Sequence, residues 1–322
     1  MDHTKAPRRI AIACQGGGSH TAFTAGALKG ILKSNPQQYE IIALSGTSGG
    51  AICALLTWAN LLTGDRNVAI SVLDAFWNDT SAHFFYDMLL NNWVVLGSRL
   101  RDVVTMPAVN PYFYPPWGQV RLQLLIEKYV DFAQIPRLVT ATSPDLLISA
   151  VDVLSGEFKV FRNTAVNAEV VLASAALPTL FRAVHTGGGV YWDGLFSQNP
   201  PIREFIAGQP DSQHKPDEIW IIQINPQRRP EEPMSVQDIQ DRRNELSGNL
   251  ALNQEIYFIE RINQFLAEGI LTSPRYKPIT VRRLLMTREL DYASKLDRNP
   301  SFIQDLIADG EATAKTFLAE HE

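Results

Sequence analysis

A serine between glycines is the residue of this sequence whose type and setting most directly suggest chemistry. Ser48 is the central residue of Gly46-Thr47-Ser48-Gly49-Gly50, which has the G-x-S-x-G pattern of a nucleophile elbow. Such a serine occupies a tight turn between a strand and a helix, and Gly46 and Gly50 allow close backbone packing around it. The pattern predicts acyl transfer, with the helix N-terminus favouring the developing oxyanion. The alternative is a glycine-rich turn in which the serine only caps the helix.

A second glycine-rich turn, Gly16-Gly17-Gly18-Ser19, precedes the elbow in the sequence. Its backbone N–H groups could point at a ligand oxygen, and we interpret Gly16, Gly17 and Gly18 as a candidate oxyanion hole. Dinucleotide or phosphate binding is the rival interpretation. It is disfavoured because Thr21 stands where G-x-G-x-x-G needs a glycine and no G-K-[ST] follows.

A nucleophilic serine needs a base, and the six histidines offer no clear one. His185, just before three glycines, is the best placed, whereas His20 is expected to line or pack against the start of a helix. Asp193 is the competing candidate, because its aromatic neighbours Tyr191 and Trp192 would partly desolvate the carboxylate and strengthen it as a base. The alternative is that Asp193 and the following glycine form a hairpin turn, which these residues by themselves favour.

The elements that must position these residues follow from the hydrophobic pattern. Four apolar runs have the length of buried strands: residues 10–14, 41–44, 146–153 and 218–224. Helical patterns follow or separate them: residues 22–32, 51–62, 168–176, 236–265 and 302–318. Both glycine turns thus lie between a strand and a helix, and two consecutive units of this kind imply a parallel sheet. The predicted class is α/β with helices on both faces of the sheet.

A segment rich in aromatic residues, 67–118, interrupts this alternation. Ten aromatic residues gather there: Phe76, Trp77, Phe84, Phe85, Tyr86, Trp93, Tyr112, Phe113, Tyr114 and Trp117. Aromatic side chains favour amphipathic interfaces, so the segment could be a cap over a hydrophobic site. A helical layer packed on the core is an equally good interpretation.

Composition narrows the class of protein. A hydrophobic fraction of 45% and a charged fraction of 20% are typical of a folded globular domain. The net charge of -5 argues against a general nucleic-acid binder. Four arginine pairs are interpreted as solvated surface: Arg8-Arg9, Arg228-Arg229, Arg242-Arg243 and Arg282-Arg283.

Two further features of the sequence bear on the cellular compartment in which the protein is expected. Cys14 and Cys53 lie in apolar stretches and are expected to be buried thiols, which fits a reducing environment. Residues 1–9 lack the hydrophobic region of a secretory signal, and the longest apolar stretch, 51–62, is too short to span a bilayer. We therefore expect a cytoplasmic protein whose membrane contact is peripheral.

The order and spacing of these segments resemble the patatin-like phospholipases. Residues 16–28 look like the family's glycine-rich oxyanion loop and following helix, and residues 46–50 look like its nucleophile elbow. Residues 172–178, 191–194 and 199–201 are similar to the segment that delivers its catalytic aspartate.

The resemblance implies a fold and a mechanism. The fold is a three-layer αβα sandwich with a mostly parallel central sheet. Ser48 would be the nucleophile, and Asp193 would accept its proton and later activate water, with no histidine in the mechanism. Neither a metal nor an organic cofactor follows. We expect one domain, 1–322, with a catalytic core at about 8–226, the aromatic insertion and a C-terminal helical extension at about 234–322.

The expected activity is that of a phospholipase A or lysophospholipase, acting on phospholipid or other acyl lipid at a membrane surface. A soluble ester or thioester hydrolase or a transacylase with the same dyad is one alternative, and a catalytically silent lipid-binding module is another. Three residues depart from the family pattern: His20 replaces the usual Arg or Lys, Thr21 the usual Gly, and Leu195 the common Gly or Ala. The departures at His20 and Thr21 are the best argument for the silent module.

Overall fold

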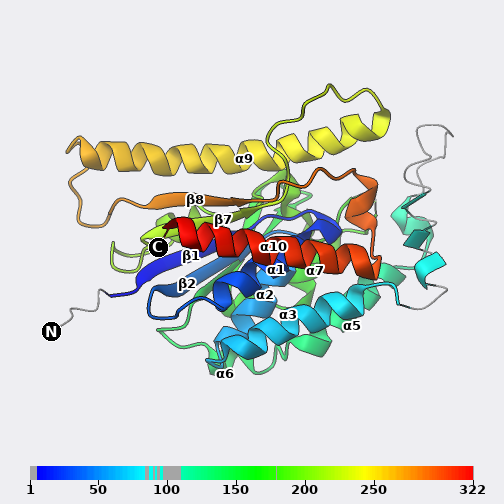
Figure 1. Cartoon of the computed structure of the whole chain (residues 1–322), viewed down its shortest axis with the longest axis horizontal. Coiled ribbons are helices and arrows are strands. Elements are labelled where there is room, and N and C mark those ends of the chain that lie inside the picture. Colours follow the sequence, from blue (N-terminus) through cyan, green and yellow to red (C-terminus); the bar gives the residue numbers. More distant parts are fainter. Residues whose placement is uncertain are drawn as a thin grey trace.

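The computed structural model of this protein describes residues 6–83, 87–89, 91–92, 95–96, 110–178 and 180–321. One mixed sheet forms its centre, with the strand order β5-β6-β3-β2-β1-β7-β8 and β4 paired to β3 (Figure 1). The strands are β1 (Arg8–Cys14), β2 (Tyr39–Gly46), β3 (Asp145–Asp152), β4 (Phe158–Arg162), β5 (Val184–Thr186), β6 (Gly189–Asp193), β7 (Glu218–Gln223) and β8 (Thr280–Leu285). Strands β3, β2, β1, β7 and β8 are parallel to one another, whereas β4 and β6 run antiparallel to β3.

Alternate residues of the strands face two separate hydrophobic layers. From β1, Ile10 and Ile12 face the first layer, and Ala11 and Ala13 face the second. The first layer holds α1 (Thr21–Leu32), α2 (Gly49–Leu61), α3 (Arg66–Thr80), α5 (Trp117–Tyr129), α6 (Ile135–Leu138), α7 (Ala168–Ser174) and α10 (Pro300–His321). The second holds α8 (Glu204–Ala207) and the long α9 (Val236–Ala267), which lies along the other side of the sheet in Figure 1. The architecture is thus the predicted three-layer αβα sandwich.

The four predicted strands are present as β1, β2, β3 and β7, and each predicted helix has its counterpart. Four strands were not predicted. Among them, β8 extends the sheet beside β7 within the region expected to be a helical extension. Its sequence Thr-Val-Arg-Arg-Leu-Leu interrupts the apolar run with two arginines, so the hydrophobic pattern did not indicate a strand.

The hairpin turn of this region is formed by Gly187 and Gly188 and not by Asp193. Strands β5 and β6 pair as Thr186 with Gly189, leaving Gly187 and Gly188 as a two-residue turn. Both have a positive φ, 55° and 82°, as the common tight hairpin turn requires. Asp193 instead ends β6, so the hairpin-turn interpretation of Asp193 is wrong.

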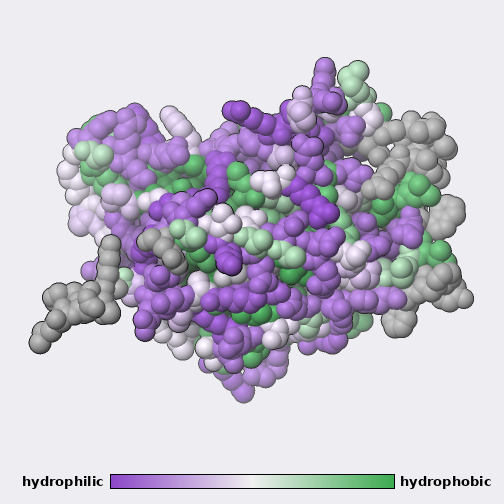
Figure 2. All heavy atoms as spheres, viewed as in Figure 1, coloured by the Kyte–Doolittle hydropathy of each residue, from purple (hydrophilic) through white to green (hydrophobic). Residues whose placement is uncertain are grey.

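The aromatic segment divides into two parts. Phe76 and Trp77 are buried on α3, as a helical layer packed on the core predicts. Four others are exposed at and before the start of α5: Tyr112, Phe113, Tyr114 and Trp117. In the space-filling view, hydrophobic side chains gather at the end of the molecule where α5 begins (Figure 2). The remaining predicted members, Phe84, Phe85, Tyr86 and Trp93, lie outside the described residues.

Some of the remaining predicted features agree with the structure and others do not. Cys14 and Cys53 are buried free thiols, as expected. The surface interpretation of the arginine pairs is wrong for one member of each: four side chains form ion pairs with buried glutamates, namely Arg8 and Arg282 with Glu218, and Arg229 and Arg242 with Glu245. Among the described residues, none of the helices combines the length and apolar character needed to cross a bilayer.

Candidate active site

Ser48 stands on the turn between β2 and α2 in a strained backbone conformation. Its φ of 56° and ψ of -129° are unusual for a residue with a side chain. The turn is tight because strand end and helix start touch. A Cβ on Gly46 would lie 2.5 Å from the Gly50 oxygen, and one on Gly50 would lie 2.3 Å from the Cys14 oxygen. Both positions therefore require glycine, as the elbow interpretation predicts.

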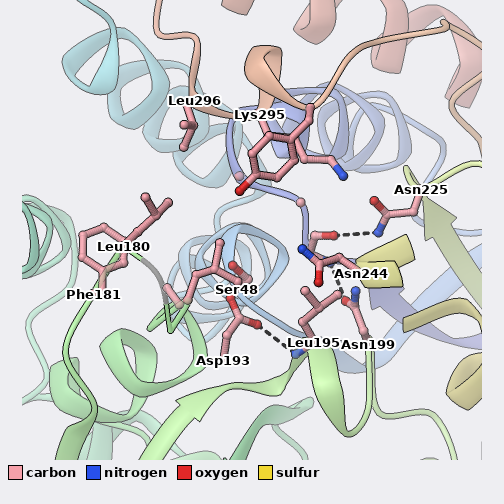
Figure 3. A pocket seen from close by; sticks show the side chains of 16 residues that line it. Ser48, Leu180, Phe181, Asp193, Leu195, Asn199, Asn225, Asn244, Lys295 and Leu296 are labelled. Atoms are coloured by element: carbon pink, nitrogen blue, oxygen red, sulfur yellow. Dashed lines mark hydrogen bonds between the residues drawn. The ribbon is translucent and has the colours of Figure 1, made fainter. Parts of the chain in front are cut away.

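Hydrogen bonds hold the turn in place from several directions. The Ser48 N–H donates to Ser174 Oγ at 2.9 Å, which ties the turn to the end of α7. The Thr47 hydroxyl lies 2.6 Å from Ser149 Oγ and donates to the Gln198 carbonyl at 2.7 Å. The Ser48 backbone is thus fixed, and its side chain points into a pocket at the carboxyl end of the parallel strands (Figure 3).

Asp193 lies beside Ser48, at the point where β6 ends (Figure 3). Its N–H donates to the Ala176 carbonyl at 3.0 Å, and its Oδ1 accepts the Leu195 N–H at 2.9 Å. The residue is 3% exposed. Burial raises the pKa of its carboxyl to about 7, although hydrogen bonds from the Leu195 N–H and the Ser48 hydroxyl act in the opposite direction. A carboxyl with a pKa near neutrality is suited to accept and return a proton.

The first glycine turn supplies backbone donors, but not all three that were predicted. The Gly16 N–H already donates to Asn199 Oδ1 at 2.7 Å, and the Gly16 carbonyl accepts from Asn225 Nδ2 at 3.0 Å. The donor role predicted for Gly16 therefore does not fit this arrangement. The N–H groups of Gly17 and Gly18 have no hydrogen-bond partner in the described part of the chain and remain available to an oxyanion.

Buried amides brace this glycine turn from behind. Gln15 Oε1 accepts the backbone N–H groups of Ile224 and Asn225 at 3.0 and 2.8 Å. Gln15 Nε2 donates to Asn249 Oδ1 on α9 at 2.9 Å. The network joins the ends of β1 and β7 to α9, so that the free N–H groups are held in position before a substrate arrives.

The pocket around Ser48 has a cavity volume of about 140 Å³ and two chemically different sides. Leu180 and Phe181 lie on one side, and Asn225 and Asn244 lie on the other, with Lys295 and Leu296 above Ser48 in Figure 3. Three further apolar side chains also line it, Ala175, Leu177 and Leu195, together with Asn199 and Tyr292. An acyl chain fits the apolar side, and polar groups of a substrate fit the other.

None of the histidines that the structure describes lines the pocket around Ser48. Burial, with a smaller contribution from the Lys295 ammonium, lowers the pKa of His20 to about 3, and its Nε2 lies 2.8 Å from Ser294 Oγ. His185 is exposed on β5. Among the described residues that line the pocket there is no histidine, which leaves Asp193 as the group beside Ser48 that can accept a proton.

Several residues of the site were missed by sequence reasoning. Asn244 and Lys295 come from segments with no motif of their own, and α9 and the C-terminal region bring them to the pocket. Ser174, which binds the Ser48 N–H, lies in residues 172–178, a segment noted for its likeness to the family. Asn199 likewise belongs to a segment with this likeness, residues 199–201, which is the signal that pointed to it.

Comparison with known proteins identifies the family. The model of the patatin-like phospholipase family matches residues 12–206, which include both glycine turns, Ser48 and Asp193. The chain belongs to the patatin-like phospholipases. Membership places the protein, at the level of the family, among lipid hydrolases.

Two bacterial proteins are among the solved structures that this chain resembles. VipD from Legionella pneumophila is 12% identical, with a TM-score of 0.47, and the alignment covers 98% of this chain and 67% of VipD. ExoU from Pseudomonas aeruginosa, in its complex with SpcU, is 16% identical with a TM-score of 0.38, covering 98% of this chain and 52% of ExoU. The chain thus spans about half the length of ExoU. Among proteins with curated descriptions, none matches this sequence.

The fold accommodates the three residues at which this chain departs from the patatin-like pattern, His20, Thr21 and Leu195. The Thr21 hydroxyl donates to the Gly18 carbonyl at 2.6 Å and so stabilises the glycine turn. Leu195 provides the N–H that binds Asp193, and its side chain lines the pocket. His20 is neutral, but the Lys295 ammonium lies close enough to affect its pKa, so a positive charge is present near the turn.

Proposed function

We propose that this patatin-like phospholipase hydrolyses carboxylic esters of phospholipids or other acyl lipids through a dyad of Ser48 and Asp193. One observation carries the proposal. A serine in a strained elbow faces a buried carboxyl whose pKa is raised to about 7, beside two unpaired backbone N–H groups. This set contains a nucleophile, a base and oxyanion donors, which acyl transfer requires.

In the acylation step, Ser48 Oγ attacks the carbonyl carbon of the ester and its proton passes to the Asp193 carboxylate. The carbonyl oxygen becomes an oxyanion, and the N–H groups of Gly17 and Gly18 stabilise it by hydrogen bonds. When the intermediate collapses, the bond to the leaving oxygen breaks. That oxygen takes the proton from Asp193, leaving an acyl group on Ser48.

In the deacylation step, Asp193 removes a proton from water while the water oxygen attacks the acyl-enzyme. The second oxyanion binds to the same N–H groups, and collapse returns the proton from Asp193 to Ser48 Oγ with release of the fatty acid. Since both steps begin with ionised Asp193, whose pKa is about 7, activity on a soluble ester should rise as the pH increases through 7.

Lipid substrates are favoured over soluble esters by the exposed aromatic residues near the pocket. Phe113 and Trp117 are 83% and 73% exposed, in a position to enter the interfacial region of a membrane. Arg182 ties their segment to the pocket wall. Its guanidinium donates to the carbonyls of Pro111 and Tyr114 at 3.1 and 2.5 Å, directly after the pocket residues Leu180 and Phe181.

The proposal is tested by turnover of a p-nitrophenyl acyl ester together with labelling by a fluorophosphonate probe. The wild-type protein should do both, and Ser48→Ala should do neither. Ser45→Ala is a matched control, because Ser45 is buried on β2 and its hydroxyl has no hydrogen-bond partner among the described residues. A wild-type protein with neither turnover nor labelling would instead favour the silent lipid-binding module.

A further inference from the structure

A second cleft adjoins the catalytic pocket and shares Asn225 and Lys295 with it. Its volume is about 430 Å³, larger than that of the catalytic pocket. Four cationic side chains line it, against two carboxylates: Arg228, Arg229, Arg288 and Lys295, against Glu245 and Glu289. The cleft is therefore locally basic in a chain with a net charge of -5.

Two of these cations balance buried carboxylates of α9. Arg229 pairs with Asp241 and with Glu245, and Lys295 Nζ lies 2.5 Å from Asp241 Oδ1. Arg242 also binds Glu245, at 3.0 Å. Three cations thus surround two carboxylates, which leaves one positive charge in excess beside the cleft.

The other two cations differ in their availability. Arg288 binds Asp309 at 3.1 Å, and its guanidinium lies 5.9 Å from the centre of the Phe302 ring. Arg228 is exposed and makes no hydrogen bond or ion pair with any residue that the structure describes. Arg228 is therefore the cation of the cleft that is most available to a ligand.

The two cavities are arranged in a way that suits one amphipathic molecule. In Figure 3, Lys295 Nζ points toward Asn225 and away from Leu180 and Phe181, which lie across Ser48. Asn244, from α9, lines the catalytic pocket, and its side-chain amide has no hydrogen-bond partner in the described part of the chain. Polar side chains thus line the side of the catalytic pocket that borders the basic cleft, where Asn225 and Lys295 belong to both cavities.

The positive charge of the cleft depends on lysine and arginine alone. His20 also lines it, but that side chain is buried and bound to Ser294, and its lowered pKa keeps it neutral at physiological pH. The residue at position 20, usually cationic in this family, therefore contributes no charge, and the C-terminal Lys295 together with Arg228 supplies it from other elements.

We propose that this cleft binds the headgroup phosphate of a phospholipid whose scissile ester lies at Ser48 and whose acyl chain lies against Leu180 and Phe181. Arg228 would donate charge-assisted hydrogen bonds to the phosphate oxygens, since a guanidinium matches their geometry. Lys295 adds positive charge at the junction of the two cavities. The inference rests on the proposed function and extends it to substrate choice.

The test compares Arg228→Gln with Arg243→Gln. Arg243 is also an exposed arginine without a partner among the described residues, but it lines neither cavity. Substrates are phosphatidylcholine and diacylglycerol with the same acyl chains in the same mixed micelles. The measured quantity is kcat/KM for phosphatidylcholine divided by kcat/KM for diacylglycerol. Arg228→Gln should lower this ratio by about tenfold, because one charge-assisted hydrogen bond to the phosphate is lost. Arg243→Gln should leave this ratio unchanged, and an unchanged ratio in Arg228→Gln overturns the proposal.

A second arm distinguishes the headgroup from a free phosphate compound. Glycerol 3-phosphate should compete with phosphatidylcholine, and less strongly so in Arg228→Gln. If it instead stimulates diacylglycerol hydrolysis in an Arg228-dependent way, the cleft is a regulatory site and the proposal is wrong. Wild-type protein that hydrolyses neither lipid would refute the proposed function. In that case, binding of phosphatidylcholine micelles to Ser48→Ala, with and without Arg228→Gln, still tests the cleft, because equal binding by both variants overturns the proposal.

Discussion

Two glycine-rich turns stand side by side in this protein and use glycine for different purposes. The strands that precede them, β1 and β2, are parallel neighbours whose ends are in register, Cys14 beside Gly46. In the second turn the residue with positive φ is Ser48, at 56°, and in the first it is Gly18, at 60°. One turn therefore holds a side chain in a strained conformation, and the other avoids the strain because it presents only backbone.

The difference fits the roles proposed for the two turns, a nucleophile in one and oxyanion donors in the other. A nucleophile requires a side chain, so its backbone strain must be offset by the contacts of Thr47 and Ser48 with the surrounding fold. An oxyanion site requires only N–H groups, and side chains there would be obstacles. A Cβ on Gly18 would lie 2.4 Å from the Lys295 carbonyl oxygen. The two turns should consequently respond to substitution in different ways.

The largest expected effect is loss of the dyad itself. Ser48→Ala and Asp193→Asn should each lower kcat on a p-nitrophenyl ester by about 10⁴-fold or more, because one removes the nucleophile and the other the base. The double variant should be about as inactive as either single one, since groups that act as a unit are not additive. His185→Ala should retain substantial activity. An Asp193→Asn protein that turns over normally would remove this carboxyl from the mechanism.

The next effect concerns stability and follows from the buried carboxyl. The Asp193 pKa is about 7 in the folded state and about 3.9 in the unfolded state. Between about pH 3.9 and about pH 7 the carboxyl is therefore protonated in the folded protein and ionised in the unfolded one. The free energy of unfolding of the wild type should therefore fall, relative to Asp193→Asn, as the pH rises from about 4 to about 8, by on the order of 4 kcal/mol.

Urea unfolding at a series of pH values measures this difference. Ser48→Ala keeps the carboxyl and should follow the wild-type trend, so it controls for loss of activity alone. Parallel pH profiles for the wild type and Asp193→Asn would mean that the carboxyl is not protonated by burial in the folded protein.

In the first glycine turn, catalysis should be sensitive to substitution of Gly18 and tolerant of substitution of Gly17. Gly18→Ala should lower kcat by about 10²- to 10³-fold, because positive φ and the Lys295 carbonyl both force the loop and its N–H groups to move. Gly17→Ala should lower kcat by less than about tenfold, since the one close contact of its Cβ is the flexible end of Ile224, and Asn225 Oδ1 lies at an ordinary contact distance of 3.6 Å. Kinetics with a soluble ester check both, and equal losses would show that the turn responds as a whole.

Interfacial binding should be separable from both turns. Phe113→Ser with Trp117→Ser should lower vesicle hydrolysis by about tenfold while hydrolysis of a soluble ester changes little, because only apolar insertion into the interface is lost. Leu154→Ser is a matched control, since Leu154 is 80% exposed on the turn between β3 and β4. Equal losses on vesicles and soluble ester would mean that these side chains support the fold or the pocket.

The smallest expected effect measures the backbone strain at Ser48. Ser48→Gly should be more stable than Ser48→Ala by about 1 kcal/mol, because glycine adopts the elbow conformation without a Cβ penalty. Thermal unfolding of the two inactive variants measures it. A less stable glycine variant would show that the elbow is not strained at this residue.

Local sequence was sufficient for the two turns and the strands before them. Each turn follows a short apolar strand and precedes an apolar helix, so the pattern within about twenty residues already indicated where Ser48 would stand. The role of Asp193 was less accessible. Its neighbours favoured a hairpin turn, and only pairing of Thr186 with Gly189 moves that turn to Gly187 and Gly188.

Other features depended on contacts between distant segments. The Gly16 N–H is occupied by Asn199, which is 183 residues away in the sequence. Lys295 reaches the pocket because β8 and α10 bring the C-terminal region back to the sheet. No pattern of hydrophobic spacing reports such contacts, because spacing describes which face of an element is buried and not what it is buried against.

For this protein, the sequence by itself determined the class of fold, the family and the residue types at the two turns, since these depend on backbone geometry and hydrophobic periodicity within short segments. The tertiary structure alone decided which N–H groups of the glycine turn stay free, how far burial raises the pKa of Asp193, and where a cation stands in place of the missing one at position 20. Those properties are set by desolvation and by partners from remote segments, which exist only once the chain has folded.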